Sequence, residues 1–111
     1  MVNIAVVGCT GKLGSSIAKS IIKRDDVNLK YAIGRNGNQY IGCDISSVIG
    51  GRDIGILITN DVESATDCDV FIDCTNADAF VNNNLPKYYK INKPYPTCFM
   101  THWCLSQKGG L

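Results

Sequence analysis

Residues 2–14 are VNIAVVGCTGKLG, and this stretch decides the fold of the 111-residue chain. Its first six residues are mostly apolar and β-branched, and a glycine follows them, which is typical of a short buried parallel strand. Beyond the glycines, Ile17, Ala18, Ile21 and Ile22 recur at helical spacing. The change of period therefore predicts a strand, a glycine turn and a helix.

The three glycines of this turn have different expected roles. Gly8 can adopt a positive φ for a tight turn, and the missing side chain at Gly11 would let a diphosphate approach the backbone. Gly14 would let the helix pack close to the strand. Unpaired N–H groups of the first helical turn would face the phosphates, and Lys12 would add a positive charge. The G-x-x-G-x-x-G spacing differs from the commoner G-x-G-x-x-G, so an ordinary glycine-rich connection stays an alternative.

A second strand is predicted at Leu29–Ile33, and Gly34-Arg35 follows it. In a dinucleotide-binding unit this position, about 20 residues beyond the glycine turn, contacts the adenosine ribose. A glycine leaves room for a 2′-phosphate and a guanidinium can pair with it, which favours NADP. The alternative is a solvated loop arginine at Arg35.

The rest of the chain alternates predicted strands and helical segments. Thr75 follows the fourth strand, at the edge where ligands bind in open α/β sheets. We expect an α/β fold with a Rossmann-like, doubly wound parallel sheet that is incomplete at its C-terminal end. The expected elements are a long loop at 36–51 with a short turn at 45–49, a strand at 54–59, a helical turn at 61–66, a strand at 69–73, a helix at 77–90 interrupted at Pro86, and a strand starting at Lys93-Pro94.

Composition restricts the class of protein. A net charge of +1 without a basic block gives no reason to expect a nucleic-acid partner. No apolar run has the length of a membrane span and no signal-peptide pattern begins the chain, so we expect a cytoplasmic protein without a membrane partner. None of the six cysteines forms C-x-x-C, and the spacing of Cys98, His102 and Cys104 is not a familiar metal motif, so we expect no metal.

In their order along the chain, these motifs resemble the 4-hydroxy-tetrahydrodipicolinate reductase family, also called dihydrodipicolinate reductase. The likeness covers residues 2–94. It rests on the opening strand with its glycine turn, on two segments around the second strand, and on the third-strand turn and the fourth strand: residues 4–14 (IAVVGCTGKLG), 32–35 (AIGR), 41–44 (IGCD), 59–61 (TND) and 69–75 (DVFIDCT).

The resemblance implies an NAD(P)-binding, Rossmann-like domain at residues 1–94. It places a pyrophosphate at the turn, the adenosine ribose after the second strand, and Thr75 near the nicotinamide. NADPH is the expected cofactor, with NADH as the second choice, because many members have an acidic residue where this chain has glycine. Cys74 replaces the family's Phe. The implied cofactor-binding residues are Gly8, Gly11, Lys12, Leu13, Gly14, Gly34, Arg35 and Thr75.

After Lys93-Pro94 the sequence departs from the family. We expect residues 95–111 to be a divergent, poorly ordered tail. The family's C-terminal domain, with its His-His-x-x-Lys motif, cyclic dicarboxylate site and tetramer interface, is expected to be absent, as in a truncated or frameshifted sequence. No catalytic residue is therefore assigned.

The resemblance implies a reductase that transfers hydride from NADPH in the diaminopimelate route of lysine biosynthesis, and a fragment that is inactive alone. One alternative is a stand-alone dinucleotide-binding or redox-sensing module without catalysis. The other is a small α/β domain that binds no nucleotide.

Overall fold

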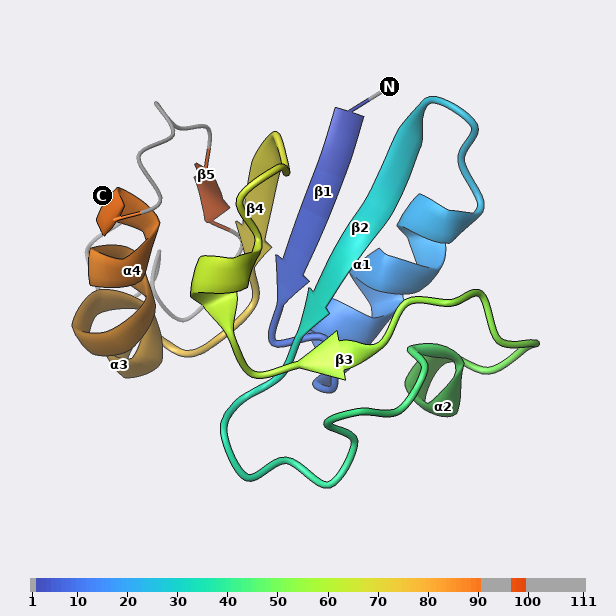
Figure 1. Cartoon of the computed structure of the whole chain (residues 1–111), viewed down its shortest axis with the longest axis horizontal. Helices are drawn as coiled ribbons and strands as arrows, with labels where there is room; N and C mark the ends of the chain where they lie inside the picture. Colours follow the sequence, from blue (N-terminus) through green and yellow to red (C-terminus); the bar gives the residue numbers. More distant parts are fainter. Residues whose placement is uncertain (1, 91–96, 100–111) are drawn as a thin grey trace.

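The computed structural model describes residues 2–90 and 97–99. It contains a five-stranded sheet in which all neighbouring strands are parallel and the order is β3-β2-β1-β4-β5 (Figure 1). This is the strand order of doubly wound dinucleotide-binding sheets, so the expected α/β Rossmann-like class is confirmed. The strands are β1 Val2–Val7, β2 Val27–Ile33, β3 Ile58–Thr59, β4 Val70–Asp73 and β5 Thr97–Phe99.

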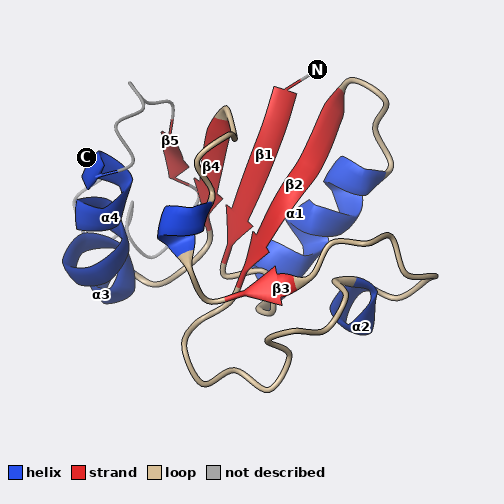
Figure 2. Ribbon diagram, viewed as in Figure 1, coloured by secondary structure: helices blue, strands red, loops and turns tan. Residues whose placement is uncertain are grey.

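Helical segments pack on both faces of the sheet. In Figure 2 the longest of them, α1, passes behind β2. The segments are α1 Lys12–Ile22, α2 Ser46–Ile49, the 3₁₀ turn η1 Val62–Ser64, α3 Ala77–Ala79, the π-helical η2 Phe80–Asn84 and α4 Leu85–Lys90. No helix in the described part of the chain is long and apolar enough to cross a membrane.

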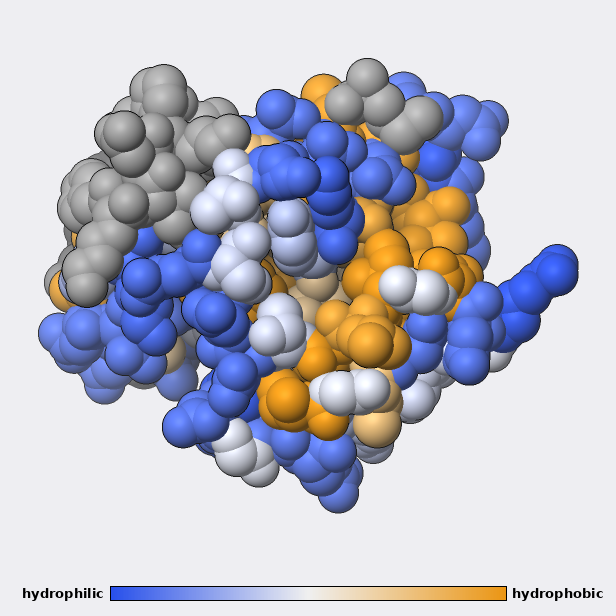
Figure 3. Space-filling view, in the orientation of Figure 1, coloured by the Kyte–Doolittle hydropathy of each residue, from blue (hydrophilic) through white to orange (hydrophobic). Residues whose placement is uncertain are grey.

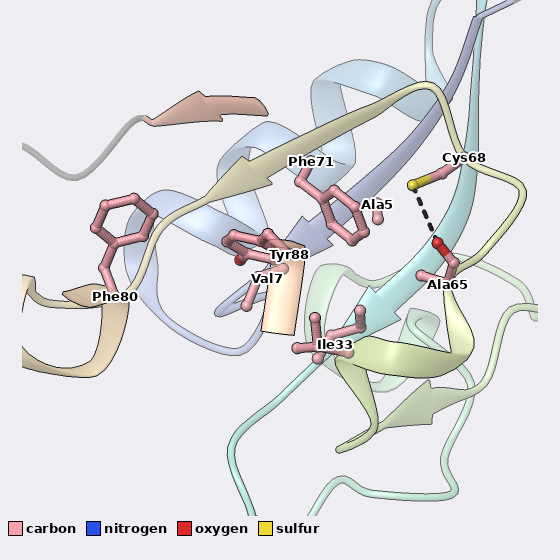
Figure 4. Close-up of a cluster of buried hydrophobic side chains, with 9 residues drawn as sticks. Ala5, Val7, Ile33, Ala65, Cys68, Phe71, Phe80 and Tyr88 are labelled. Carbon is pink, nitrogen blue, oxygen red and sulfur yellow. Dashed lines mark hydrogen bonds between the residues drawn. The ribbon is translucent and has the colours of Figure 1, made fainter. Parts of the chain in front are cut away.

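Alternation along β1 produces the two cores, because successive side chains of a strand point to opposite faces. Ile4 and Val6 belong to a buried cluster that includes Ala18 of α1. Ala5 and Val7 belong to the opposite cluster, which includes aromatic side chains. There the Tyr88 ring of α4 lies between those of Phe71 and Phe80, at centroid distances of 4.7 and 6.3 Å (Figure 4). Burial on both faces explains why β1 is almost continuously apolar.

The strand predicted at 54–59 is wrong over its first four residues, because only Ile58–Thr59 pairs as a strand. Gly55 has a φ of 85°, which interrupts an extended chain. The carboxylate of Asp44 accepts hydrogen bonds from the N–H groups of Ile54, at 3.3 Å, and Gly55, at 2.7 Å. These donors are therefore held by a loop side chain rather than by a strand. On the face in Figure 3, apolar surface lies over this part of the sheet, and Leu57 is 60% exposed.

The predicted turns agree with the structure, since α2 lies within 45–49 and η1 within 61–66. The helix predicted at 77–90 is also present, and its expected interruption at Pro86 takes the form of a change from π to α geometry at Leu85. Proline has no N–H group to donate to the preceding turn. The hydrogen-bonding pattern of the helix already changes at Leu85, one residue before Pro86, so the missing donor is tolerated there.

Strand β5 pairs with β4 inside the segment that we expected to be poorly ordered. The pairing joins Phe71 to Thr97, Ile72 to Cys98 and Asp73 to Phe99. The rest of the expected tail, the strand start at Lys93-Pro94, and the residues His102 and Cys104 lie outside the described residues.

Candidate functional site

The glycine turn joins the carboxyl end of β1 to α1. Gly8 has a φ of 84°, as expected for a tight turn. Its N–H group and that of Cys9 both donate to the carbonyl oxygen of Ile33, at 2.8 and 3.2 Å, which ties the turn to the end of β2. Gly11 is the N-cap residue of α1, with an extended backbone at φ −81° and ψ 174°. The N–H groups of the first helical turn are therefore presented at this end of the sheet.

Gly14 lies at a close contact between the helix and the glycine turn that follows β1, whereas the sequence predicted close packing against the strand. A Cβ atom built on Gly14 would lie 2.0 Å from the carbonyl oxygen of Gly8 and 2.7 Å from its carbonyl carbon. Only a glycine fits at this contact, because both opposing atoms belong to the backbone.

A cavity of about 260 Å³ lies at the carboxyl ends of β1, β2 and β4, the lower edge of the sheet in Figure 1. It brings together five of the predicted site residues, which are Gly8, Gly11, Gly34, Arg35 and Thr75. The other three do not line it. Lys12 and Leu13 are exposed on the first turn of α1, and Gly14 is buried against the turn.

The charge of the cavity wall suits an anion. Arg35 lines it from the loop after β2 and Lys87 from α4, and none of the described lining residues is Asp or Glu. Its remaining polar lining is neutral and includes five asparagines, Asn36, Asn60, Asn76, Asn83 and Asn84. A cleft with cations and amide groups attracts phosphate and carboxylate groups.

Lys87 was not predicted as a site residue. It is half-buried on α4, four residues beyond Asn83, so the two share one helix face. That spacing is the only sequence signal for the pair, and it is equally typical of a solvated helix face.

At the end of β2, side-chain bonds fix the loop that carries Arg35. Asn38 Nδ2 donates to Thr10 Oγ1 of the glycine turn at 2.8 Å, and Asn60 Nδ2 donates to Asn36 Oδ1 at 2.8 Å. Neither of the ion pairs within the described residues involves Arg35, and its side chain is exposed beside the cavity. The guanidinium is therefore available to a ligand.

At the end of β4, the fully buried carboxylate of Asp73 collects hydrogen bonds. Its Oδ1 accepts from the N–H of Thr75 at 2.9 Å and from the Thr75 hydroxyl. Its Oδ2 accepts from Asn84 Nδ2 at 3.1 Å and from the Tyr88 hydroxyl at 2.5 Å. Burial, with Asp73 nearby, raises the pKa of Tyr88, so its phenol stays a proton donor. Sequence reasoning missed this network, which joins residues up to 15 positions apart.

The buried Cys9 thiol provides a pH-dependent prediction. Burial raises its pKa from 9.0 to about 12, and the neighbouring Cys74 adds to the rise. Since the unfolded chain ionises first, this contribution to stability is complete below pH 9 and is lost as the pH rises toward 12. We expect the free energy of unfolding, measured with urea at pH 7, 9 and 10.5, to fall less steeply with pH for Cys9→Ala than for the wild type. Ser20→Ala on exposed α1 is the control, and equal slopes for Cys9→Ala and the wild type would contradict the prediction.

The parallel sheet, the glycine turn and the cavity at the strand-order reversal define a Rossmann-like domain with a cavity at its topological switch point, where such folds bind ligands. Residues 2–95 match the family model described as "Dihydrodipicolinate reductase, N-terminus". The chain belongs to this family, as its motifs predicted.

Several curated relatives are named 4-hydroxy-tetrahydrodipicolinate reductase. The protein from Roseobacter denitrificans is 34% identical over 79 residues, which cover 70% of this chain and 29% of the relative. That from Wolbachia pipientis subsp. Culex pipiens is 32% identical over 95 residues, covering 84% and 36%. That from Nitrosomonas europaea is 38% identical over 74 residues, covering 66% and 27%. The chain thus spans about a third of the length of these relatives.

Proposed function

We propose that this chain is the cofactor-binding part of a 4-hydroxy-tetrahydrodipicolinate reductase, with NADPH as its preferred cofactor and NADH as the weaker one. The observation that carries the proposal is the cavity, where the glycine turn, Gly34-Arg35 and Thr75 meet and no described lining residue has a carboxylate. In the complete enzyme, hydride from NADPH reduces a cyclic dicarboxylate in the diaminopimelate route of lysine biosynthesis. The cytoplasmic location stays a prediction.

The residues present fit a nicotinamide dinucleotide. Among the described residues, a Cβ atom on Gly11 would meet only the Gly8 carbonyl oxygen, at 3.6 Å, which leaves space beside the turn for a pyrophosphate. Arg35 would pair with the adenosine 2′-phosphate, and Gly34 offers no carboxylate to repel it. When bound, the cofactor supplies the hydride, while the protein orients and binds it. We assign no proton donor or substrate-binding residue to this chain.

Gly11→Val tests whether the turn cradles a diphosphate. The backbone at Gly11 suits any L-residue, so the fold should persist while the added branches fill the space beside the turn. We expect NADPH affinity by calorimetry to fall roughly tenfold or more, about 1.4 kcal/mol. Lys19→Ala, on exposed α1 away from the cavity, is the matched control. Unchanged affinity in a folded Gly11→Val would contradict the turn's role, and no saturable binding to the wild type would contradict the proposed function.

A stand-alone dinucleotide-binding or redox-sensing module would have the same cavity. The two proposals differ in what the rest of the native protein contains. An intact mass of the native gene product well above 12.0 kDa, with the family's His-His motif encoded downstream, would support the reductase. NADPH binding without turnover by a native 12.0 kDa protein would support the module.

A further inference from the structure

The Asp73 network determines which hydrogen-bonding groups Thr75 presents to the cavity. Asp73 Oδ1 accepts from both the N–H and the hydroxyl of Thr75, so the hydroxyl proton is committed to the buried carboxylate. Thr75 Oγ1 also accepts from Asn84 Nδ2 at 3.3 Å. One lone pair of Oγ1 is left, and Thr75 can offer a ligand only an acceptor.

Asn84 likewise has only a hydrogen-bond acceptor left to offer a ligand. Its Nδ2 donates to Asp73 Oδ2 and to Thr75 Oγ1, which uses both amide hydrogens. Its Oδ1 has no hydrogen-bond donor among the described residues, although the residue is only 7% exposed and lines the cavity. A buried carbonyl oxygen without a donor is costly, which points to a donor supplied from the cavity.

We propose that Thr75 and Asn84 form an acceptor-only patch that selects an N–H₂ group of the bound dinucleotide. This inference rests on the proposed function. The pyrophosphate position after β1 and the ribose position after β2 leave the nicotinamide half to the β4 side of the sheet. The N–H₂ of the nicotinamide carboxamide is therefore the expected donor. A carboxylate in its place would offer no hydrogen-bond donor to these two acceptors.

The cofactor contains a second N–H₂ group, the 6-amino group of adenine, and the experiment separates the two sources. Calorimetry on the full chain compares NADP⁺ with two analogues: one with nicotinic acid in place of nicotinamide, and one with hypoxanthine in place of adenine. We expect the nicotinic acid analogue to bind the wild type at least about tenfold more weakly than NADP⁺, and the hypoxanthine analogue to bind like NADP⁺.

Variants then test the residues. Thr75→Val removes one of the two acceptors while keeping the side-chain shape, so it should lower the amide-to-acid affinity ratio. Thr75→Ser keeps the hydroxyl and should keep the ratio. Tyr88→Phe removes another donor to Asp73 outside the cavity wall, so it should lower the melting temperature and leave the ratio unchanged.

The outcomes are distinct. Discrimination against the hypoxanthine analogue alone, lowered in Thr75→Val, supports the acceptor patch and assigns its donor to adenine. Equal wild-type affinity for all three dinucleotides, or an unchanged ratio in folded Thr75→Val, overturns the inference while NADPH binding stands. No saturable binding of either NADP⁺ or NADPH overturns the proposed function itself.

Discussion

Gly14→Ala should destabilise the chain by about 3 kcal/mol or more, at the upper end of what overpacking costs. The added Cβ would lie 2.0 Å from the Gly8 carbonyl oxygen, closer than real Cβ contacts come. The obstacle is backbone, and the Gly8 N–H is bonded to Ile33, so the turn cannot move aside as a flexible side chain would. The helix α1 would have to leave its buried cluster instead. Urea unfolding followed by circular dichroism measures the loss.

Gly37→Ala is the matched control for that substitution. Gly37 has a φ of 84°, yet a Cβ there would have no atom of the described residues within 4 Å. Its cost is backbone strain alone, roughly 1–2 kcal/mol for an L-residue in the left-handed region. A Gly14→Ala loss no larger than that of Gly37→Ala would show that the close contact between α1 and the turn is not a main determinant of stability.

The parts of the fold that the sequence predicted well are those specified locally. The apolar run of β1, the three glycines and the helical spacing of α1 are contiguous, and each constrains the backbone by itself. The segment before β3 was predicted wrongly because a distant residue decides it. Asp44 takes the N–H groups of Ile54 and Gly55, and a local pattern of apolar residues carries no sign of that bond.

The residues of the candidate site also fall into those that the local sequence predicts and those that it does not. Gly8, Gly11, Gly34, Arg35 and Thr75 could be predicted because they stand beside strand ends, which parallel topology gathers at one edge. Asp73, Asn84 and Tyr88 could not. Asn84 and Tyr88 come from the helical segments after β4, and the π-helical η2 alters the spacing that would relate them to the strand. Tertiary packing alone joins them to Asp73.

Arg35→Ala should weaken NADPH binding about 10- to 100-fold and leave NADH binding nearly unchanged. Only NADPH carries the 2′-phosphate, and hydrogen bonds to charged groups contribute roughly 1.5–3 kcal/mol. Arg35 lines the cavity beside Gly34 and has no ion-pair partner among the described residues. Calorimetric titration with both cofactors measures the ratio of their dissociation constants. Arg52→Ala, at an exposed loop residue outside the cavity wall, is the control.

Adding Gly34→Asp to Arg35→Ala should reverse the preference toward NADH, with a total change in the affinity ratio of roughly 100-fold or more. A Cβ at position 34 would meet Ile58 at 3.4 Å and Ile41 at 3.5 Å, which are ordinary contacts, so the fold should accept the side chain. The new carboxylate would accept hydrogen bonds from the ribose hydroxyls of NADH and repel the 2′-phosphate of NADPH. If both cofactors lost affinity equally in the single and double variants, the end of β2 would not be the adenosine site, and the orientation of the dinucleotide along the sheet would have to be reversed.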